Sequence, residues 1–252
     1  MRDIRFRVFL IAVICFSAFA AVLAARFFPC KTAVSSQARD LYHRSVYVLQ
    51  SLTEAAAEEK AVSPSGIVHS DETESLLHHP DKILVLGKIA EDLASLRAEF
   101  PEARLFEAYA RMALGERAEA ARLLAHYVAE NEYRPAHYAL LCENLAKSGD
   151  YVSLLVFSQE WKEKDPSCNR DRSRYIVAAF YNSGRFDDAL KAARAEGDCL
   201  GWEAEVYAAK AILGQGDEDH ARRVLLRAEN RFTENAAQIR RLWDLLRGKS
   251  VL

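Results

Sequence analysis

Hydrophobic residues recur three or four positions apart along most of the chain after residue 36, which is the spacing of amphipathic α-helices. This pattern predicts a helix over 36–60 with Ser36 as its N-cap, and another over 81–99 that Pro101 closes. The intervening residues 61–80 contain proline, glycine and serines without an apolar period, so a flexible loop is expected there. A last helix is expected over 233–249, with Thr233 as its N-cap.

The composition agrees with an all-α fold. Half of the 252 residues are hydrophobic, and there are 10 glycines and 6 prolines. Alanine, leucine, glutamate and arginine are abundant, and all four favour helix. The formal net charge of −2 argues against a nucleic-acid partner, because phosphate binding requires a basic surface.

Residues 8–28 form a nearly uncharged apolar segment of about the length that crosses a bilayer as a helix. Residues 1–7 carry Arg2, Arg5 and Arg7, which favours a basic cytoplasmic tail and an extracytoplasmic location, such as a bacterial periplasm, for the rest of the chain. The expected protein is therefore single-pass, with residues 8–28 as a signal anchor. Cleavage as a signal peptide, followed by secretion, is the alternative, since Ala18–Ala20 and Val22–Ala24 resemble cleavage sites. With reversed orientation, the domain would be cytoplasmic.

The five cysteines show no CxxC spacing, so they predict neither a zinc site nor a redox pair. A disulfide between Cys168 and Cys199 is conceivable outside the cytosol, and the alternative is that both are small buried residues. Six possible ligands gather in the loop region, but a solvated acidic loop explains them better than a metal site; they are His69, Asp71, Glu72, Glu74, His78 and His79. No metal or other cofactor is expected.

Four glycines divide the second half of the chain into similar lengths. Gly115, Gly149, Gly184 and Gly216 are 34, 35 and 32 residues apart, and each lies between two apolar-periodic segments. A period near 34 indicates a helical-hairpin repeat. A glycine at each hairpin turn would end the first helix in the left-handed conformation.

The phrases around these glycines resemble the turn of the tetratricopeptide (TPR) family; they are ALGERAEA (113–120), KSGDYVSL (147–154), NSGRFDDA (182–189) and GQGDEDHA (214–221). The resemblance covers residues 101–232. It implies a right-handed solenoid of about four TPR-like hairpins, preceded by the transmembrane helix and closed by the C-terminal helix as a cap, with 81–249 as one repeat domain. It also implies buried alanines at 120, 189 and 221 and packing aromatics at 151 and 186. Leu154, Val177 and Glu218 depart from the family pattern, so the later repeats are expected to pack less regularly.

In that family, the first helices of the hairpins form a concave groove that binds peptides or proteins. The resemblance places eight residues of this chain in the groove: Tyr109, Met112, Glu143, Lys147, Arg174, Tyr181, Asn182 and Lys210. We therefore expect a membrane-anchored scaffold or adaptor with a protein or peptide partner. A structural subunit of a membrane or envelope complex is the alternative. No catalytic motif is present, so neither an enzyme nor a small-molecule substrate is expected.

Overall fold

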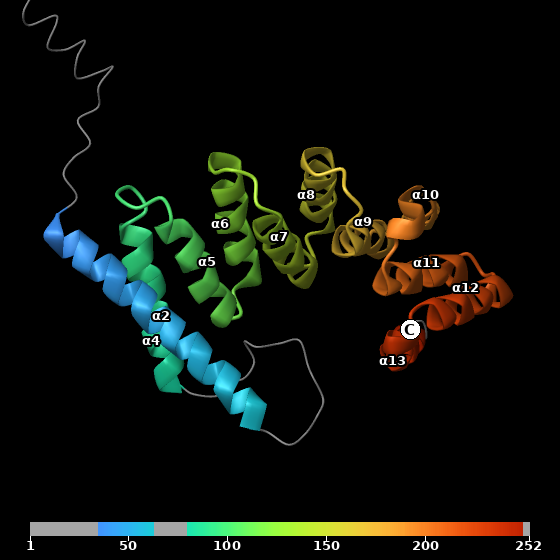
Figure 1. The fold of residues 1–252 in the computed structure, drawn as a ribbon, viewed down its shortest axis with the longest axis horizontal. Coiled ribbons are helices and arrows are strands. Elements are labelled where there is room, and N and C mark those ends of the chain that lie inside the picture. The colour runs from blue at the N-terminus through green and yellow to red at the C-terminus, as the bar shows by residue number, and fades with distance from the viewer. Residues whose placement is uncertain (1–34, 63–79, 249–252) are drawn as a thin grey trace, which may run out of the picture. The chain divides into compact units, whose positions relative to one another are not determined.

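The computed structural model describes residues 35–62 and 80–248. Within these ranges, the regular elements are α-helices and short 3₁₀ helices, and no strand occurs. The α-helices, labelled in Figure 1, are α2 (Ser36–Val62), α4 (Pro80–Ser95), α5 (Ala103–Ala113), α6 (Arg117–Glu130), α7 (Pro135–Ser148), α8 (Tyr151–Lys164), α9 (Arg170–Asn182), α10 (Phe186–Glu196), α11 (Trp202–Gly214), α12 (Glu218–Arg231) and α13 (Ala236–Gly248). Short 3₁₀ turns, η1 (Gly197–Cys199) and η2 (Thr233–Asn235), precede α11 and α13. The chain is therefore all-α over its described part.

Several expectations fall outside the described residues. These are the basic tail 1–7, the transmembrane helix 8–28, most of the loop 61–80 and the group of possible metal ligands between His69 and His79. Ala61, Val62 and Pro80, which were assigned to the loop, belong to helices α2 and α4. None of the described helices combines the length and the hydrophobicity needed to span a bilayer.

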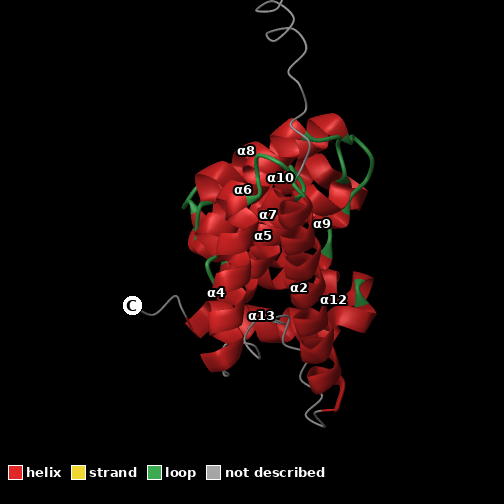
Figure 2. Ribbon diagram, turned by 90° about the vertical axis from the view of Figure 1, so that its left-hand side faces the viewer, coloured by secondary structure: helices red, strands yellow, loops and turns green. Residues whose placement is uncertain are grey.

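The chain divides into a unit ending at Leu41 and a unit beginning at Tyr42. From α4 to α13, each helix packs against the next one in the chain. In addition, α7 contacts α9, α9 contacts α11, and α11 contacts α13. Figures 1 and 2 show the same arrangement of helices in two views. The chain therefore folds into successive helical pairs, and from α7 onward the first helix of one pair lies beside the first helix of the next.

The turns within these pairs have the expected glycine conformation. Gly115, Gly149, Gly184 and Gly216 all have positive φ, between 72° and 89°. Gly149 caps α7 in the left-handed region, and the N–H of Asp150 then donates to the carbonyl of Leu145. The Asp150 carboxylate accepts from the Ser153 N–H and so caps α8.

Small residues allow the paired helices to approach closely, as the repeat pattern predicted. Ala120, Ala189 and Ala221 near the starts of the second helices are fully buried. So are Ala108, Cys142 and Ala209 in the first helices. Burial raises the pKa of the Cys142 thiol to about 12, so this cysteine stays protonated and acts as a packing residue.

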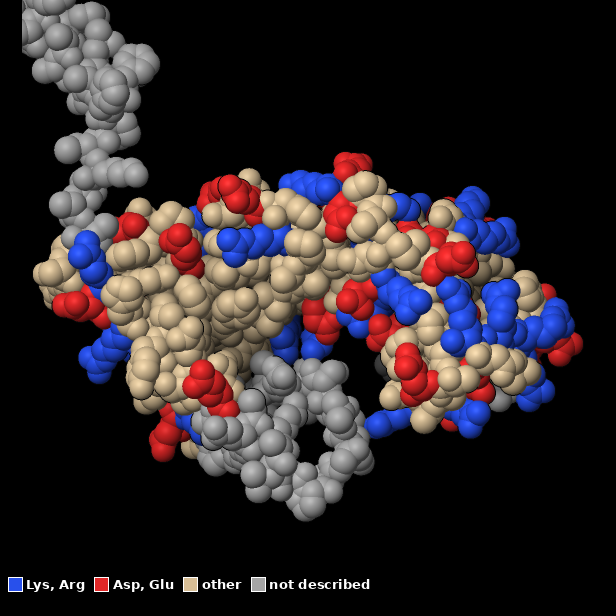
Figure 3. Space-filling view, viewed as in Figure 1, with Lys and Arg blue, Asp and Glu red and all other residues tan. Residues whose placement is uncertain are grey.

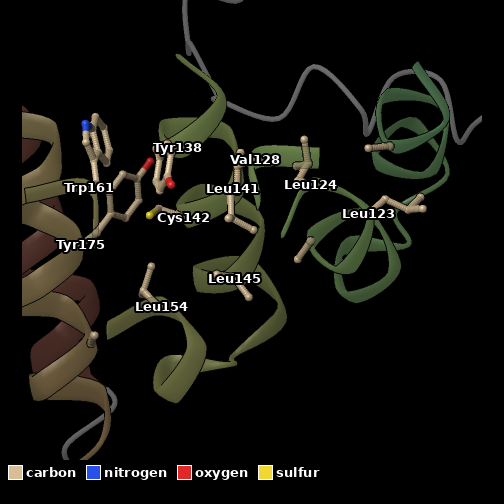
Figure 4. Close-up of a cluster of buried hydrophobic side chains, with 13 residues drawn as sticks. Leu123, Leu124, Val128, Tyr138, Leu141, Cys142, Leu145, Leu154, Trp161 and Tyr175 are labelled. Atoms are coloured by element: carbon tan, nitrogen blue, oxygen red, sulfur yellow. The ribbon is translucent and has the colours of Figure 1, made fainter. Parts of the chain in front are cut away.

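A hydrophobic cluster joins α5 to α9 (Figure 4). Tyr138, Trp161 and Tyr175 bring aromatic rings from α7, α8 and α9 to this cluster, next to Cys142. The Tyr138 and Trp161 ring centroids are 6.4 Å apart. Leu154, at a position where the repeat pattern has alanine, is fully buried here. The larger side chain is therefore accommodated within the core.

Cys168 and Cys199 form a disulfide, with their Cα atoms 5.1 Å apart. The bond joins the segment before α9 to the η1 turn before α11. Arg172 is almost fully buried beside the first of these segments, and its guanidinium donates to the carbonyls of Asp165 and Ser167. The disulfide thus joins the two segments, and the hydrogen bonds of Arg172 hold the segment before α9 in place.

Three predicted helix ends differ from the structure. The Oγ of Ser35, rather than Ser36, accepts the capping hydrogen bond from the Ala38 N–H at 3.0 Å. The helix expected to reach Glu99 ends at Ser95, because the chain tightens into a turn in which the Leu96 N–H bonds the Leu93 carbonyl. Thr233 begins the η2 turn instead of capping a helix, and α13 starts at Ala236.

Candidate functional site

The eight residues expected in a groove all lie on the first helices of the pairs. Tyr109 and Met112 belong to α5, Glu143 and Lys147 to α7, and Lys210 to α11, whereas Arg174, Tyr181 and Asn182 belong to α9. Because α7 contacts α9 and α9 contacts α11, the residues on these three helices come close to one another. We define the polar face by seven residues: Glu143, Lys147, Arg174, Tyr181, Glu203, Tyr207 and Lys210.

Arg174 is the centre of the polar face. Its Nη1 donates to both carboxylate oxygens of Glu203, at 2.8 and 3.0 Å, and its Nη2 donates to Glu143 Oε2 at 3.2 Å. The Tyr175 hydroxyl donates to the same Glu143 oxygen at 2.8 Å. Lys147 lies one turn along α7 from Glu143, with 3.4 Å between its Nζ and the other carboxylate oxygen. A chain of alternating charges therefore crosses from α7 through α9 to α11.

Partial burial shifts the pKa values of the side chains around Arg174. The pKa of the Glu203 carboxyl is raised because burial disfavours its charge more than Arg174 stabilises it. Burial opposes the charge of Arg174, but Tyr175, Glu203 and Glu143 outweigh that effect and raise the pKa of the guanidinium. The pKa of the Tyr175 hydroxyl is raised mainly by burial. Tyr175 and Arg174 therefore remain hydrogen-bond donors at neutral pH.

A second group of side chains continues the polar face toward the ends of α9 and α11. The Tyr181 and Tyr207 ring centroids are 5.6 Å apart. Lys210 Nζ donates to the Tyr181 hydroxyl at 3.0 Å and lies 5.0 Å from the centre of its ring. Lys210 is only 4 % exposed, so its role is to hold the Tyr181 side chain in position, and it offers little surface to a partner.

The remaining expected residues lie apart from this network. Tyr109 packs beside Phe106, with ring centroids 6.3 Å apart, and Met112 packs against the hydrophobic cluster. Asn182 is exposed, and its side-chain amide donates to the Ala178 carbonyl one turn back at 2.9 Å. Within the described part of the chain, none of these three side chains forms a hydrogen bond or ion pair with the charged residues around Arg174.

Sequence reasoning missed Tyr175, Glu203 and Tyr207. Glu203, Tyr207 and Lys210 follow one another at i, i+4 and i+7, so they share one side of α11. That spacing was a signal that could have linked Glu203 and Tyr207 to Lys210. It was obscured because the last interval between turn glycines is 32 residues rather than 34.

The polar face combines carboxylates, cations and phenol hydroxyls on adjacent helices. Figure 3 shows acidic and basic side chains close together on the hollowed surface beneath α7 and α9. Among the described side chains, no three or more metal-ligating groups converge. The arrangement can donate and accept several hydrogen bonds at once, which suits recognition of a polar backbone.

Comparison with protein-family models and with curated proteins found no match to this chain.

Proposed function

We propose that this protein is a membrane-anchored scaffold or adaptor with a TPR-like solenoid, and that the polar face binds a segment of a partner protein. The observation that carries the proposal is the row of ion pairs from Glu143 through Arg174 to Glu203, which crosses three first helices. The contacts between alternate helices and the left-handed glycine turns support the solenoid. The nearly uncharged segment 8–28 supports the anchor.

The partner segment would be extended and would bind chiefly through its backbone. The Glu143 and Glu203 side chains are 35 % and 27 % exposed, so their carboxylates can accept from peptide N–H groups. Lys147, at 28 %, can donate to a carbonyl or to an acidic side chain of the segment. Tyr181 and Tyr207 provide flat apolar surface beside these polar groups. An extended chain needs this mixture of donors, acceptors and apolar contact.

The disulfide supports an extracytoplasmic location for the repeat domain. Structural disulfides persist in oxidising compartments, whereas cytosolic reductants keep most thiols reduced. The bond between Cys168 and Cys199 therefore favours the orientation in which residues after 28 lie outside the cytoplasm. Secretion after cleavage of the N-terminal segment would place the disulfide in the same environment.

A structural subunit of a membrane complex is the second candidate. Val152 and Val156 on α8 are 76 % and 56 % exposed and lie one helical turn apart. Such an apolar pair is a suitable contact for another subunit. In that case α8, rather than the polar face, would make the principal interaction.

The proposal is tested by affinity purification of the full-length chain from native membranes, with recovered proteins quantified by mass spectrometry. The test variant is Lys147→Glu, which reverses a charge on the polar face without removing a core side chain. We expect recovery of the specific partner to fall at least tenfold, because this change removes a hydrogen-bond donor and repels an acidic side chain of the segment.

A matched control combines Arg223→Glu and Glu234→Lys, two exposed positions away from the polar face. This control should recover the partner at the normal level. Unchanged recovery with the Lys147→Glu variant would refute binding at the polar face. Loss of the partner after Val152→Asp and Val156→Asp substitutions alone would favour the structural subunit.

A further inference from the structure

A cavity of about 550 Å³ lies among α10, η1, α11 and α12. Its apolar wall includes Leu190 and Leu200, together with Ile212 and Val224 from α11 and α12. Arginines from α10 and α12 also line it. The volume is within the range of roughly 300–1,000 Å³ that is usual for small-ligand sites.

The cavity is on the opposite side of α11 from the polar face. The helix turns by about 100° per residue, so side chains separated by two positions lie far apart around its axis. Glu203, Tyr207 and Lys210 belong to the polar face, whereas the cavity is lined by Glu205, Ala208 and Ile212. The centres of these two sets of side chains are therefore about 180° apart around the axis of α11. The cavity is therefore a separate feature that the proposed scaffold function does not use.

One arginine in the cavity wall is already engaged. Arg231 Nη1 donates to Glu205 Oε1 and its Nη2 donates to the carbonyl of Asp198, both at 2.8 Å. Glu205 is only 2 % exposed, and its Oε2 has no hydrogen-bond partner among the described residues. Arg231 thus balances the buried charge of Glu205 and fixes the η1 turn at the cavity edge.

Two other arginines remain available. Arg194 on α10 and Arg227 on α12 are exposed, and within the described part of the chain neither forms a hydrogen bond or an ion pair. Figure 3 shows basic side chains gathered over the C-terminal helices that include α12. The cavity wall contains these two arginines with Arg231, against the carboxylates of Asp198 and Glu205. The excess charge is positive, and it lies beside an apolar surface.

We propose that this cavity binds a carboxylate that carries an apolar body, with Arg194 and Arg227 holding the carboxylate and the apolar wall covering the body. Guanidinium groups form paired hydrogen bonds with carboxylates, so both arginines suit this anion. The apolar wall disfavours a small inorganic anion, which would leave that wall uncovered. A peptide with a hydrophobic C-terminal residue and a free aliphatic acid share this chemistry.

The test uses the full-length chain reconstituted in lipid nanodiscs, because detergents could themselves occupy an apolar cavity. Binding is measured by isothermal titration calorimetry with four probes. These are an acetylated pentapeptide ending in leucine, the same peptide with an amidated C-terminus, octanoate and octanol. We expect at least one acid to bind, and its neutral counterpart to bind at least tenfold more weakly. The stronger of the two acids identifies the natural source of the carboxylate.

The double variant Arg194→Gln/Arg227→Gln should weaken binding of that acid at least tenfold. Both side chains are exposed, so helix content and thermal stability should stay unchanged. The matched control is Arg222→Gln/Arg223→Gln, which removes two charges from α12 outside the cavity wall and should keep the affinity. Absence of binding by both acids at millimolar concentration would overturn the proposal. Equal binding of acid and neutral probe, or retained affinity in the cavity variant, would do the same.

Discussion

Gly149 and Gly87 have equally open surroundings but different backbone conformations. A Cβ built at either position meets no atom within 4 Å, but Gly149 has φ of +78° whereas Gly87 lies within α4. Gly149→Ala should lower the free energy of unfolding by about 1–2 kcal/mol, because an L-residue is strained in the left-handed region. Gly87→Ala should raise it by roughly 0.5–1 kcal/mol through better helix propensity. Urea unfolding followed by circular dichroism measures both changes, and the same sign for the two variants would contradict this account.

At the same scale, the sequence predicted residues whose role depends on neighbours in the chain, but not those whose role depends on distant contacts. The turn glycines and the buried alanines recur at fixed offsets within each repeat, so the spacing revealed them. Glu107 is a residue of the second kind. It is fully buried and accepts two hydrogen bonds from Arg97, at 2.6 and 2.5 Å. That pair forms because α4 packs against α5, which the helical period of either segment does not reveal.

At the scale of elements, the disulfide is a covalent constraint between the starts of the alternate helices α9 and α11. It closes a loop with a sequence separation of 31, for which loss of unfolded-chain entropy predicts a stabilisation of about 3–4 kcal/mol. The double variant Cys168→Ser/Cys199→Ser should lower the free energy of unfolding by that amount. Chemical denaturation with and without dithiothreitol provides the measurement.

The reductant is also the control for this prediction. It should destabilise the natural chain to the level of the double variant and leave the variant unchanged. Equal stability of the natural chain and the variant under oxidising conditions would show that Arg172 and local packing hold these connections without the bond.

Helix existence was predictable from the sequence, but helix ends and the disulfide were less so. The apolar period identified helices over 36–60 and 81–99, but Ser35 competes with Ser36 as a cap and a turn shortens the second helix to Ser95. Cysteine spacing left the Cys168–Cys199 pairing open, because a covalent bond requires the two segments to meet in space. They meet because α9 and α11 lie side by side.

At the scale of the whole molecule, the repeat spacing predicted where the first helices of the pairs lie. Five of the expected groove residues lie on α7, α9 and α11 and form two groups: Glu143, Lys147 and Arg174 share ion pairs, and Lys210 bonds Tyr181. Tyr109 and Met112 were grouped with them, but they pack elsewhere because the ion pairs around Arg174 do not extend to α5. The cavity was not predicted, since its wall combines residues from three helices and the η1 turn.

The central claim is that a partner segment lies on the polar face, and site-specific photo-crosslinking in native membranes tests it most directly. A photoreactive phenylalanine analogue replaces Tyr181 in one version of the full-length chain and Val152, on α8, in another. The account predicts a discrete adduct from position 181, with the crosslink mapped by mass spectrometry to one extended segment of one protein, and no such adduct from position 152. The same adduct from position 152, with none from position 181, would contradict it.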